Sequence, residues 1–262
     1  MARIEIRGLS HRYTDTKGDV LTAVDDISLD IEAGHFMSVV GPSGCGKTTL
    51  LNIVAGFIPA SNGSVRVGGT PVTEPGRDRG VVFQSFGLFD WLTVRQNIEF
   101  GPRMAEVPPR ERVERADKYL ALIGLRKFAD RYPYELSGGM KQRVAIARAL
   151  ANDPEILLMD EPFAALDAQT RELMQEELLG IWEATKKTIL FITHSIEEAI
   201  YLSSDVAVMT HRPGRLKRLF EVSLPYPRSG YNIRSAPEFL QLKLAVHELV
   251  REEIMKHAAE ES

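Results

Sequence analysis

Cysteine is almost absent from this chain, since Cys45 is the only one among 262 residues. A single thiol cannot form an internal disulfide, so the composition predicts a protein of a reducing compartment such as the cytosol. Long apolar runs are missing as well. Residues 1–5 lack the apolar core of a signal peptide, and no stretch approaches the length of a membrane span. We therefore expect any role at a membrane to depend on a partner.

A basic excess is also missing, because 32 Lys and Arg stand against 36 Asp and Glu, for a net charge of −4. Such a charge offers no general attraction to nucleic acid, and we expect no nucleic-acid partner. The hydrophobic content of 44% is enough to build a large core. The length lies at the upper end for one domain, which predicts one large domain with a subdomain.

The most informative stretch is Gly41–Thr49, which has the pattern G-x-x-x-x-G-K-[ST] between apolar segments. A strand, a glycine loop and a helix in this order form a phosphate-binding loop, with backbone N–H groups and the helix dipole directed at the phosphates. We expect Lys47 to reach the β- and γ-phosphates and Thr48 to ligate Mg²⁺. The sequence thus predicts binding of a nucleoside triphosphate. The residues expected at the phosphates are Gly41, Pro42, Ser43, Gly44, Cys45, Gly46, Lys47, Thr48 and Thr49.

Short segments with alternating polarity near the N-terminus predict strands. They cover Ile4–Leu9, Val24–Ile31 and Ser64–Val67, with Tyr13 expected in the loop after the first. A short buried strand is expected at Val81–Phe83, ending at Gln84.

Continuous apolar runs mark the second half of the chain. They occur at Ile156–Met159, Thr188–Thr193 and Val206–Met209, with helical patterns at Thr170–Ala184 and Ile196–Leu202. Strands buried on both faces and alternating with helices predict a parallel sheet that is covered on both sides.

The stretch between the N-terminal strands and the later apolar runs differs in composition, with three prolines before a helical pattern. The residues expected on one buried face of that helix are Val113, Ala116, Leu120 and Ile123. A second helix is expected to begin at Ser137 and to stop before Pro154. We therefore predict a helical subdomain over about residues 88–152.

The C-terminal part becomes loose and proline-bearing after Arg212–Arg215 and then ends in a helix. We predict a main domain over residues 1–228 and a C-terminal helical extension over 229–262. The extension's apolar stripe is expected to pack against its own domain. Its members are Leu242, Val246, Leu249 and Met255.

Two acidic residues end the buried strand at Ile156–Met159. Downstream of a phosphate loop, Asp160 is expected to hold Mg²⁺ together with Thr48, and Glu161 to orient and polarise an attacking water. Adjacent residues on a strand point to opposite sides, so we expect the two carboxylates to take separate roles.

The stretch Leu136–Arg143 reads LSGGMKQR. Ser137 as N-cap, followed by Gly138 and Gly139 and a basic first turn, predicts a second anion site at a helix N-terminus. An ordinary capped helix explains the stretch equally well when it is taken alone.

Taken together and in order, these motifs resemble the ATP-binding subunit of an ABC transporter, over roughly the whole chain to Arg228. Gly41–Thr49 resembles Walker A and Ile156–Glu161 resembles Walker B, with the signature motif at Leu136–Gln142 between them. Tyr13 resembles the aromatic residue that stacks on adenine. Gln84 resembles the Q-loop glutamine and His194 the switch histidine.

This resemblance implies an α/β fold: a phosphate-loop NTPase (RecA-like) core with the N-terminal antiparallel β subdomain and the inserted α-helical subdomain. It implies ATP and Mg²⁺ as ligands, and two copies paired head-to-tail with each ATP between the phosphate loop of one and the signature of the other. Catalytic roles are then expected for Glu161, His194, Gln84 and Lys47. Nucleotide contacts are expected from Tyr13, Gly41–Thr49, Ser137, Gly138 and Gly139, and metal contacts from Thr48, Gln84 and Asp160.

Two positions depart from the family pattern. Met140 replaces the usual Gln of the signature, and the D-loop Ala164–Asp167 begins with Ala-Ala where Ser-Ala is usual. The resemblance places Asp167 at the dimer interface. Since Glu161 and His194 are both present, we expect an active site.

The branch of the family is suggested by residues 88–94, LFDWLTV, which resemble the nitrate, sulfonate and taurine importers, although Asp90 replaces a usual proline. We expect an importer subunit at the cytoplasmic face of the cell membrane, attached to two separate permease subunits and served by an external solute-binding protein. Trp91 is the expected anchor on the permease.

Two other classes of function stay open on the sequence. A soluble ABC ATPase acting on ribosomes or DNA is expected to have a tandem domain, a coiled-coil insert or basic extensions. A phosphate-loop kinase or regulatory binder has no use for Leu136–Gln142 or Glu161. The transported solute is not encoded in this chain.

Overall fold

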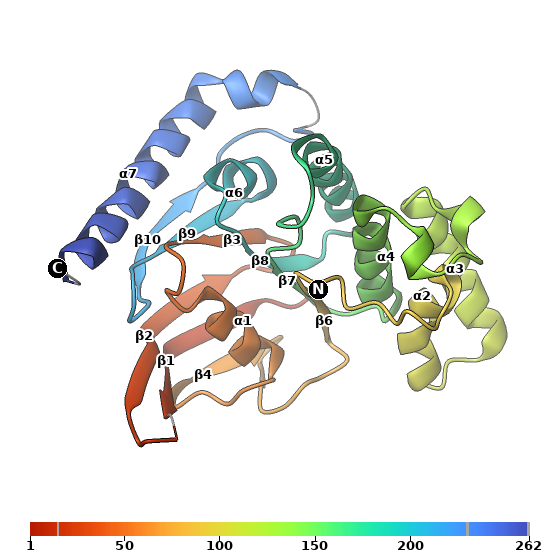
Figure 1. The fold of residues 1–262 in the computed structure, drawn as a ribbon, viewed down its shortest axis with the longest axis horizontal. Helices are drawn as coiled ribbons and strands as arrows, with labels where there is room; N and C mark the ends of the chain where they lie inside the picture. The colour runs from red at the N-terminus through yellow and green to blue at the C-terminus, as the bar shows by residue number, and fades with distance from the viewer. Residues whose placement is uncertain (15, 229–230, 261–262) are drawn as a thin grey trace. The chain divides into compact units, whose positions relative to one another are not determined.

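The computed structural model describes residues 1–14, 16–228 and 231–260, and its ribbon is drawn in Figure 1. The chain forms two compact units. The first unit comprises residues 1–76 and 186–262, and the second comprises residues 77–185. The domain division predicted from the sequence, with boundaries at 88, 152 and 228, stays a prediction.

The first unit contains an antiparallel sheet with strand order β2-β1-β4-β5. These strands are β1 (Ile4–Thr14), β2 (Val20–Ile31), β4 (Asn62–Val67) and β5 (Thr70–Pro71). The predicted β subdomain is therefore present, but β1 is longer than predicted. Tyr13 lies on the strand, paired with Leu21 of β2, and not in a loop. The apolar alternation ends at Leu9, so the sequence pattern does not show this extension. Pairing with β2 keeps the polar residues after Leu9 in the strand.

The same unit contains the strand that precedes the phosphate loop. The parallel strands β3 (Phe36–Val40), β8 (Thr188–Ile192) and β9 (Asp205–Met209) lie together, with β10 (Leu216–Glu221) antiparallel on β9. Every residue of β3 and β8 is buried. Figure 1 shows helices α6 (Ile196–Leu202) and α7 (Pro237–Glu260) on one side of these strands and α1 (Lys47–Ala55) on the other. Coverage on both sides explains why the strands read as continuous apolar runs.

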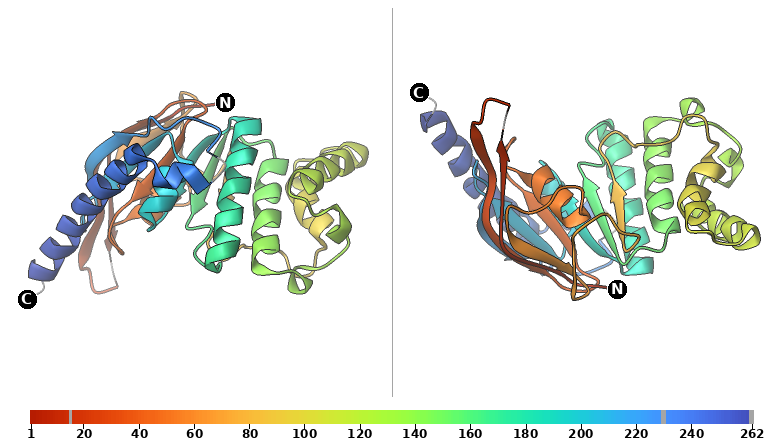
Figure 2. Two further views of the ribbon diagram at one scale, coloured as in Figure 1. Left: turned by 90° about the horizontal axis from the view of Figure 1, so that it is seen from above. Right: turned by 90° about the horizontal axis from the view of Figure 1, so that it is seen from below.

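The second unit combines two parallel strands with a group of helices. Its strands are β6 (Arg79–Val82) and β7 (Ile156–Asp160). Its helices are α2 (Val94–Met104), α3 (Pro109–Leu122), α4 (Gly138–Ala151) and α5 (Ala168–Thr185), with short 3₁₀ turns at Arg126–Phe128 and Pro133–Glu135. Both views of Figure 2 show α2, α3 and α4 side by side.

Two helices of this unit differ from the prediction. Helix α2 was not predicted, although Thr93 and Gln96 form a capping box at its start; Pro102 within the helix weakened the signal. In α3, Ala116 and Leu120 are buried as expected, whereas Val113 is exposed. The first turns of α3 are largely solvent-exposed, so an apolar stripe there has nothing to pack on.

Helix α7 packs within the first unit through residues spaced seven apart, which share one helical face. Phe239, Val246 and Glu253 are the buried members of that spacing. The predicted stripe is wrong at its last member, since Met255 is exposed. A carboxylate, and not a methionine, occupies the last buried position of the helix.

Over the part of the chain that the structure describes, no helix combines the length and the hydrophobicity that a bilayer crossing requires.

Candidate functional site

The phosphate loop lies between β3 and α1, as predicted. Gly44 and Gly46 adopt positive φ angles of 75° and 97°, a conformation that favours glycine. A Cβ at Gly46 would lie 2.7 Å from the carbonyl oxygen of Ala23 and from a methyl carbon of Val24. The chain therefore requires glycine at this position both for the backbone turn and for the close approach of β2. The turn directs the loop into the first turn of α1, whose N–H groups have no partners within a helix.

Lys47 lies inside this loop and is buried. Its Nζ donates hydrogen bonds to the carbonyl oxygens of Gly41 and Pro42, at 2.8 and 2.9 Å. These neutral oxygens hold the ammonium group in place but do not neutralise its charge. A buried positive charge within a curled, glycine-rich backbone suits a polyphosphate anion.

Cys45 belongs to the predicted phosphate contacts, but its side chain is fully buried. Burial raises the pKa of the thiol, and the nearby positive charge of Lys47 offsets only part of that effect. The thiol therefore stays protonated and inward. Cys45 can serve a phosphate only through its backbone.

Tyr13 lies beside the start of α1. Its hydroxyl oxygen is 3.3 Å from the hydroxyl oxygen of Thr49, and its ring packs edge-on against His11. The ring is half-exposed and so retains surface for a flat partner. Within the first unit, the structure thus brings Tyr13 to the phosphate loop.

His194 emerges at the same sheet edge as the phosphate loop. Val39 of β3 pairs with Ile192 of β8, so Gly41 and His194 each follow two residues after a paired position. The turn that carries His194 is held by Thr193, whose hydroxyl donates to the buried Glu198 carboxylate at 2.6 Å. Carboxyl ends of parallel strands are where open α/β sheets bind ligands.

The second unit repeats this arrangement with Gln84 and the acidic pair. Val82 of β6 pairs with Met159 of β7, so Gln84 and Glu161 each follow two residues after that pair. Asp160 is the last residue of β7, and Glu161 lies beyond the strand with a φ of 44°. The expectation of separate roles for the two carboxylates assumed that they are neighbours on one strand. Because Glu161 lies outside β7, that reason is wrong. A left-handed backbone, which is strained for a non-glycine residue, turns the chain at Glu161.

Ser137 caps α4 as predicted, with its hydroxyl oxygen accepting from the N–H of Met140 at 3.4 Å. Ser137 and Gly138 are exposed, whereas Gly139 is buried. A Cβ at Gly139 would lie 2.7 Å from the Thr170 methyl carbon of α5, so packing within the unit requires this glycine irrespective of any ligand. The exposed pair is the part of the motif that remains open to an anion.

Asp167 has a local role that sequence reasoning missed. Its carboxylate accepts from the N–H of Thr170 at 3.0 Å, and this hydrogen bond lowers the pKa of Asp167. It therefore caps α5, which begins at Ala168 and not at Thr170. The signal was present in the sequence as a polar residue three positions before a helical pattern.

Sequence reasoning also missed the contact of Gly214 with the phosphate loop. A Cβ at Gly214 would lie 2.0 Å from the carbonyl oxygen of Cys45. The available signal was the Arg212-Pro213-Gly214 turn, which marked only the start of the looser C-terminal part.

These positions fit a nucleotide. The first unit supplies the glycine-shaped loop, the buried ammonium of Lys47, the half-exposed ring of Tyr13 and the imidazole of His194. Among the described residues no cluster of three or more His, Cys, Asp or Glu side chains forms a metal site by itself. Mg²⁺ is commonly held by one or two carboxylates together with substrate phosphates, and Asp160, at the end of β7 in the second unit, is a carboxylate that suits this pattern.

The comparisons with known proteins agree with this chemistry. Residues 24–164 match the model of the ABC transporter family. The taurine import ATP-binding protein TauB of Roseobacter denitrificans is 48% identical, with 91% of this chain and 90% of that protein covered. The nitrate import ATP-binding protein NrtD of Synechocystis is 46% identical, with 95% of each chain covered. The similarity to these importers that residues 88–94 predicted is confirmed.

A solved structure supports the fold. It is the dimeric, post-hydrolysis state of an ATP-binding cassette bound to ADP and Pi, with a TM-score of 0.73 and 32% sequence identity over 85% of this chain and 100% of that one. The predicted phosphate-loop NTPase fold is confirmed. The chain belongs to the ABC transporter family and is one of its ATP-binding, ATP-hydrolysing subunits.

Proposed function

We propose that this chain powers solute import. It hydrolyses Mg²⁺-bound ATP as a head-to-tail pair with a second copy and drives two separate permease subunits, which an external solute-binding protein serves. The observation that carries the proposal is the phosphate loop with buried Lys47 in a chain that is 46–48% identical to import ATP-binding proteins. Its place is the cytoplasmic face of the cell membrane, as a peripheral subunit.

Each catalytic side chain has a distinct task in this proposal. Lys47 and the loop N–H groups bind the β- and γ-phosphates, and Tyr13 stacks on adenine. Mg²⁺, when bound through Thr48, Asp160 and Gln84, supplies charge neutralisation at the phosphates.

Glu161 orients the attacking water and accepts its proton as the new oxygen–phosphorus bond forms and ADP leaves with the electrons of the broken bond. His194 donates a hydrogen bond to the transferred phosphoryl group. The Glu161 backbone supports this role, because strained non-glycine φ angles gather at functional sites.

The second copy completes each site through Ser137 and Gly138. These exposed residues begin α4, whose N-terminus attracts an anion. An isologous pair contains two such composite sites. The solved cassette that resembles this chain was itself described as dimeric.

The attachment to the permease is expected at Trp91, whose side chain is 73% exposed. Its ring packs on Phe89 at 5.4 Å, and the Arg148 guanidinium of α4 lies 5.4 Å from the centre of the Phe89 ring. Arg148 also donates to the carbonyl oxygens of Phe86 and Gly87. A large exposed aromatic supported from beneath is typical of an interface anchor.

The solute is proposed to be a small anion or a small molecule with an anionic group, because the relatives are named for the import of nitrate, which is an anion, and of taurine, which carries a sulfonate group. The alternative, a soluble ABC ATPase not linked to transport, lacks support from those relatives.

The composite site is tested with a mixed dimer. One chain carries Lys47→Ala and the other Ser137→Arg, and both carry Glu161→Gln to prevent turnover. Each mixed dimer then has one site with both lesions and one site with neither. The intact site is expected to retain one ATP after gel filtration with Mg²⁺, and either mutant alone none. Retention no greater than the sum of the separate mutants contradicts the head-to-tail pair and favours a self-contained ATPase.

A further inference from the structure

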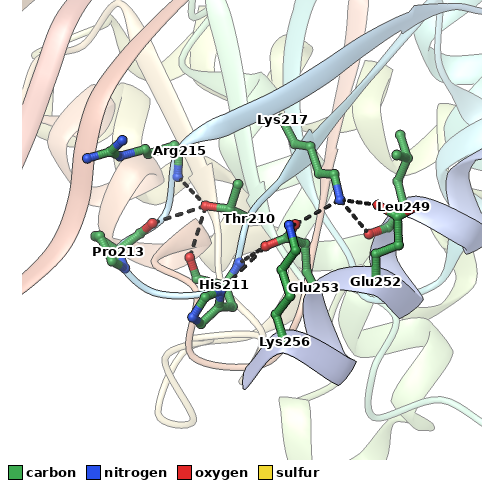
Figure 3. A network of polar contacts seen from close by, with 9 residues as sticks. All are labelled: Thr210, His211, Pro213, Arg215, Lys217, Leu249, Glu252, Glu253 and Lys256. Atoms are coloured by element: carbon green, nitrogen blue, oxygen red, sulfur yellow. Dashed lines mark hydrogen bonds and ion pairs between the residues drawn. The ribbon is translucent and has the colours of Figure 1, made fainter. Parts of the chain in front are cut away.

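The buried carboxylate of α7 is the centre of a polar network (Figure 3). The Glu253 side chain is 3% exposed. It accepts hydrogen bonds from Lys217 Nζ of β10 at 2.8 Å and from the backbone N–H of His211 at 3.1 Å. Burial alone would raise the pKa of Glu253, but the hydrogen bonds from Lys217 and His211 outweigh it and lower the pKa to about 2. The group is therefore a buried anion at neutral pH, paired with the Lys217 ammonium group and the His211 N–H.

The N–H that Glu253 binds begins a tight turn. Residues 210–215 connect β9 to β10, and the backbone N–H of Thr210 donates to the Arg215 carbonyl oxygen at 3.0 Å. The Thr210 hydroxyl oxygen accepts a hydrogen bond from the Arg215 N–H at 2.9 Å. The same hydroxyl donates toward the carbonyl oxygens of His211 and Pro213, which lie 2.9 and 3.0 Å from its oxygen. Figure 3 shows this turn closed around Thr210 next to Glu253. Because these hydrogen bonds connect the two ends of the turn, a displacement of His211 is transmitted to Gly214.

The far end of the turn is bound to β2. The Gly214 N–H donates to Ala23 and the Gly214 carbonyl accepts from Asp25, both at 2.9 Å. The Arg215 guanidinium pairs with the Asp25 carboxylate, with Nε 3.1 Å from the oxygen. These bonds attach the turn to the strand that touches Gly46 of the phosphate loop.

The turn also contacts the phosphate loop itself. At Gly214 the space for a Cβ is taken by the carbonyl oxygen of Cys45, 2.0 Å away, and by the terminal methyl of Met209, 2.6 Å away. At Gly41, a Cβ would lie 3.0 Å from the carbonyl oxygen of Met209, the residue just before the turn. The backbone of the phosphate loop therefore rests on the 210–215 turn without intervening side chains.

We propose that Glu253 is a positioning residue for the phosphate loop: by holding the N–H of His211 it sets the 210–215 turn, and Gly214 of that turn supports the backbone at Cys45. The proposal rests on ATP binding at the phosphate loop. Phosphate binding by backbone N–H groups depends on their fixed orientation, so a support that loosens lowers affinity. Glu253 touches no nucleotide and takes no part in the bond-making step.

The test compares three variants of the full chain. Glu253→Ala removes the hydrogen bonds from Lys217 and His211 together with the weaker one from Lys256, Glu253→Gln keeps an acceptor for the His211 N–H, and Glu252→Gln is the matched control. Glu252 binds the same Lys217 at 2.7 Å, but its side chain is 58% exposed. This ion pair includes no residue of the 210–215 turn.

The measurements are the KM and kcat for ATP well below the unfolding temperature, with backbone hydrogen exchange in residues 41–47 of the ATP-free protein. We expect Glu253→Ala to raise KM about tenfold with kcat nearly unchanged, within the range of remote substitutions that act through a contact network. Glu253→Gln is expected to give a smaller rise, and Glu252→Gln none. Exchange at residues 41–47 is expected to rise in the same order.

A merely structural role gives a different result: a lower unfolding temperature with unchanged KM and unchanged exchange at residues 41–47, which overturns the proposal. If Glu253→Ala does not fold, the comparison of Glu253→Gln with Glu252→Gln tests the proposal. Equal KM values for these two variants also overturn the proposal. Loss of ATP binding in Lys47→Ala verifies that the loop is the nucleotide site. If that variant binds ATP normally, the site assignment fails, and the failure is distinct from that of the Glu253 proposal.

Discussion

The two compact units carry their functional residues in opposite ways. In the first unit, the phosphate loop takes its positive φ angles at Gly44 and Gly46, where they cost little, and its one cation, Lys47, is buried and bonded. In the second unit, a positive φ falls on Glu161, a residue for which it is strained. The loop that is proposed to bind phosphate is thus relaxed, whereas the residue that is proposed to accept the proton has a strained backbone. The comparison predicts that changes in the two units separate binding from chemistry.

The largest expected effect is on chemistry and comes from the second unit. Glu161→Gln is expected to retain ATP binding and to lower the hydrolysis rate about 10²- to 10⁴-fold, the usual size of a general-base effect. Single-turnover hydrolysis measures the rate of the chemical step, and equilibrium binding measures the affinity for ATP separately. A rate within tenfold of wild type removes Glu161 from this role and with it the proposed division between the units.

The next effect concerns acid stability in the first unit. The pKa of Glu253 is about 2 in the folded protein against an ordinary value of 4.5, so its contribution to stability is complete above about pH 4.5 and is lost as pH falls toward 2. The charged groups around it are Lys217 of β10, His211 of the turn, and Lys256 and Glu252 of α7.

Thermal unfolding followed from pH 6 to pH 2 tests this dependence in wild type and Glu253→Gln. The variant is expected to be less stable at pH 6, and the difference to shrink below about pH 4.5. A difference that stays constant with pH contradicts a lowered pKa for Glu253. Glu252→Gln is the control, since its exposed side chain is expected to contribute little.

A third prediction isolates the strain at Glu161. Glu161→Gly and Glu161→Ala both remove the carboxylate, but only glycine relieves the left-handed backbone. We expect the glycine variant to be more stable than the alanine variant by about 1 kcal/mol, measured by urea unfolding, with both inactive. Elsewhere, in a helix or a strand, glycine would be the less stable of the two. Equal stabilities, or a more stable alanine variant, mean that the backbone at Glu161 stores no strain.

The smallest effect on the isolated chain is expected for Trp91→Ala. Because the ring is mostly exposed, stability should change by about 0.5 kcal/mol or less and ATP binding should be unaffected. The attachment to permease-containing membranes should weaken, as judged by the fraction of the chain that sediments with them. Phe89→Ala is the contrasting variant, since its ring packs on Trp91, Phe100 and Arg148 and is expected to contribute to stability. Unchanged membrane attachment in a stable Trp91→Ala protein removes Trp91 from the interface.

Local patterns predicted much of the architecture. Helix α6 was predicted with its observed bounds, and β7, β8 and β9 were predicted within one residue at each end. These three strands are buried except at their terminal aspartates, so hydrophobicity alone marks them. Boundaries were missed where long-range pairing or capping decides them, as in the extension of β1 to Thr14 and the start of α5 at Ala168.

The site was predicted to a similar extent. The sequence placed Gly41, His194, Gln84 and Glu161 after strands, and the structure has each two residues beyond a paired strand position. Their nucleotide roles stay predictions. The inward side chain of Cys45 was not predictable, because the motif specifies the backbone curl and leaves that side chain open.

By itself, the sequence determined the phosphate loop, the capped start of α4 and the positions of the buried strands along the chain. Each of these depends on residues within a few positions of one another, where turn geometry, capping and periodicity act. Only the tertiary structure decided that Gly139 makes room for α5 and that Gly214 lies against the backbone of Cys45. It also decided that Glu253 binds the N–H of His211 in the 210–215 turn. These contacts join residues far apart in the chain. No local pattern encodes them, because close packing is decided by which distant surfaces meet in the fold.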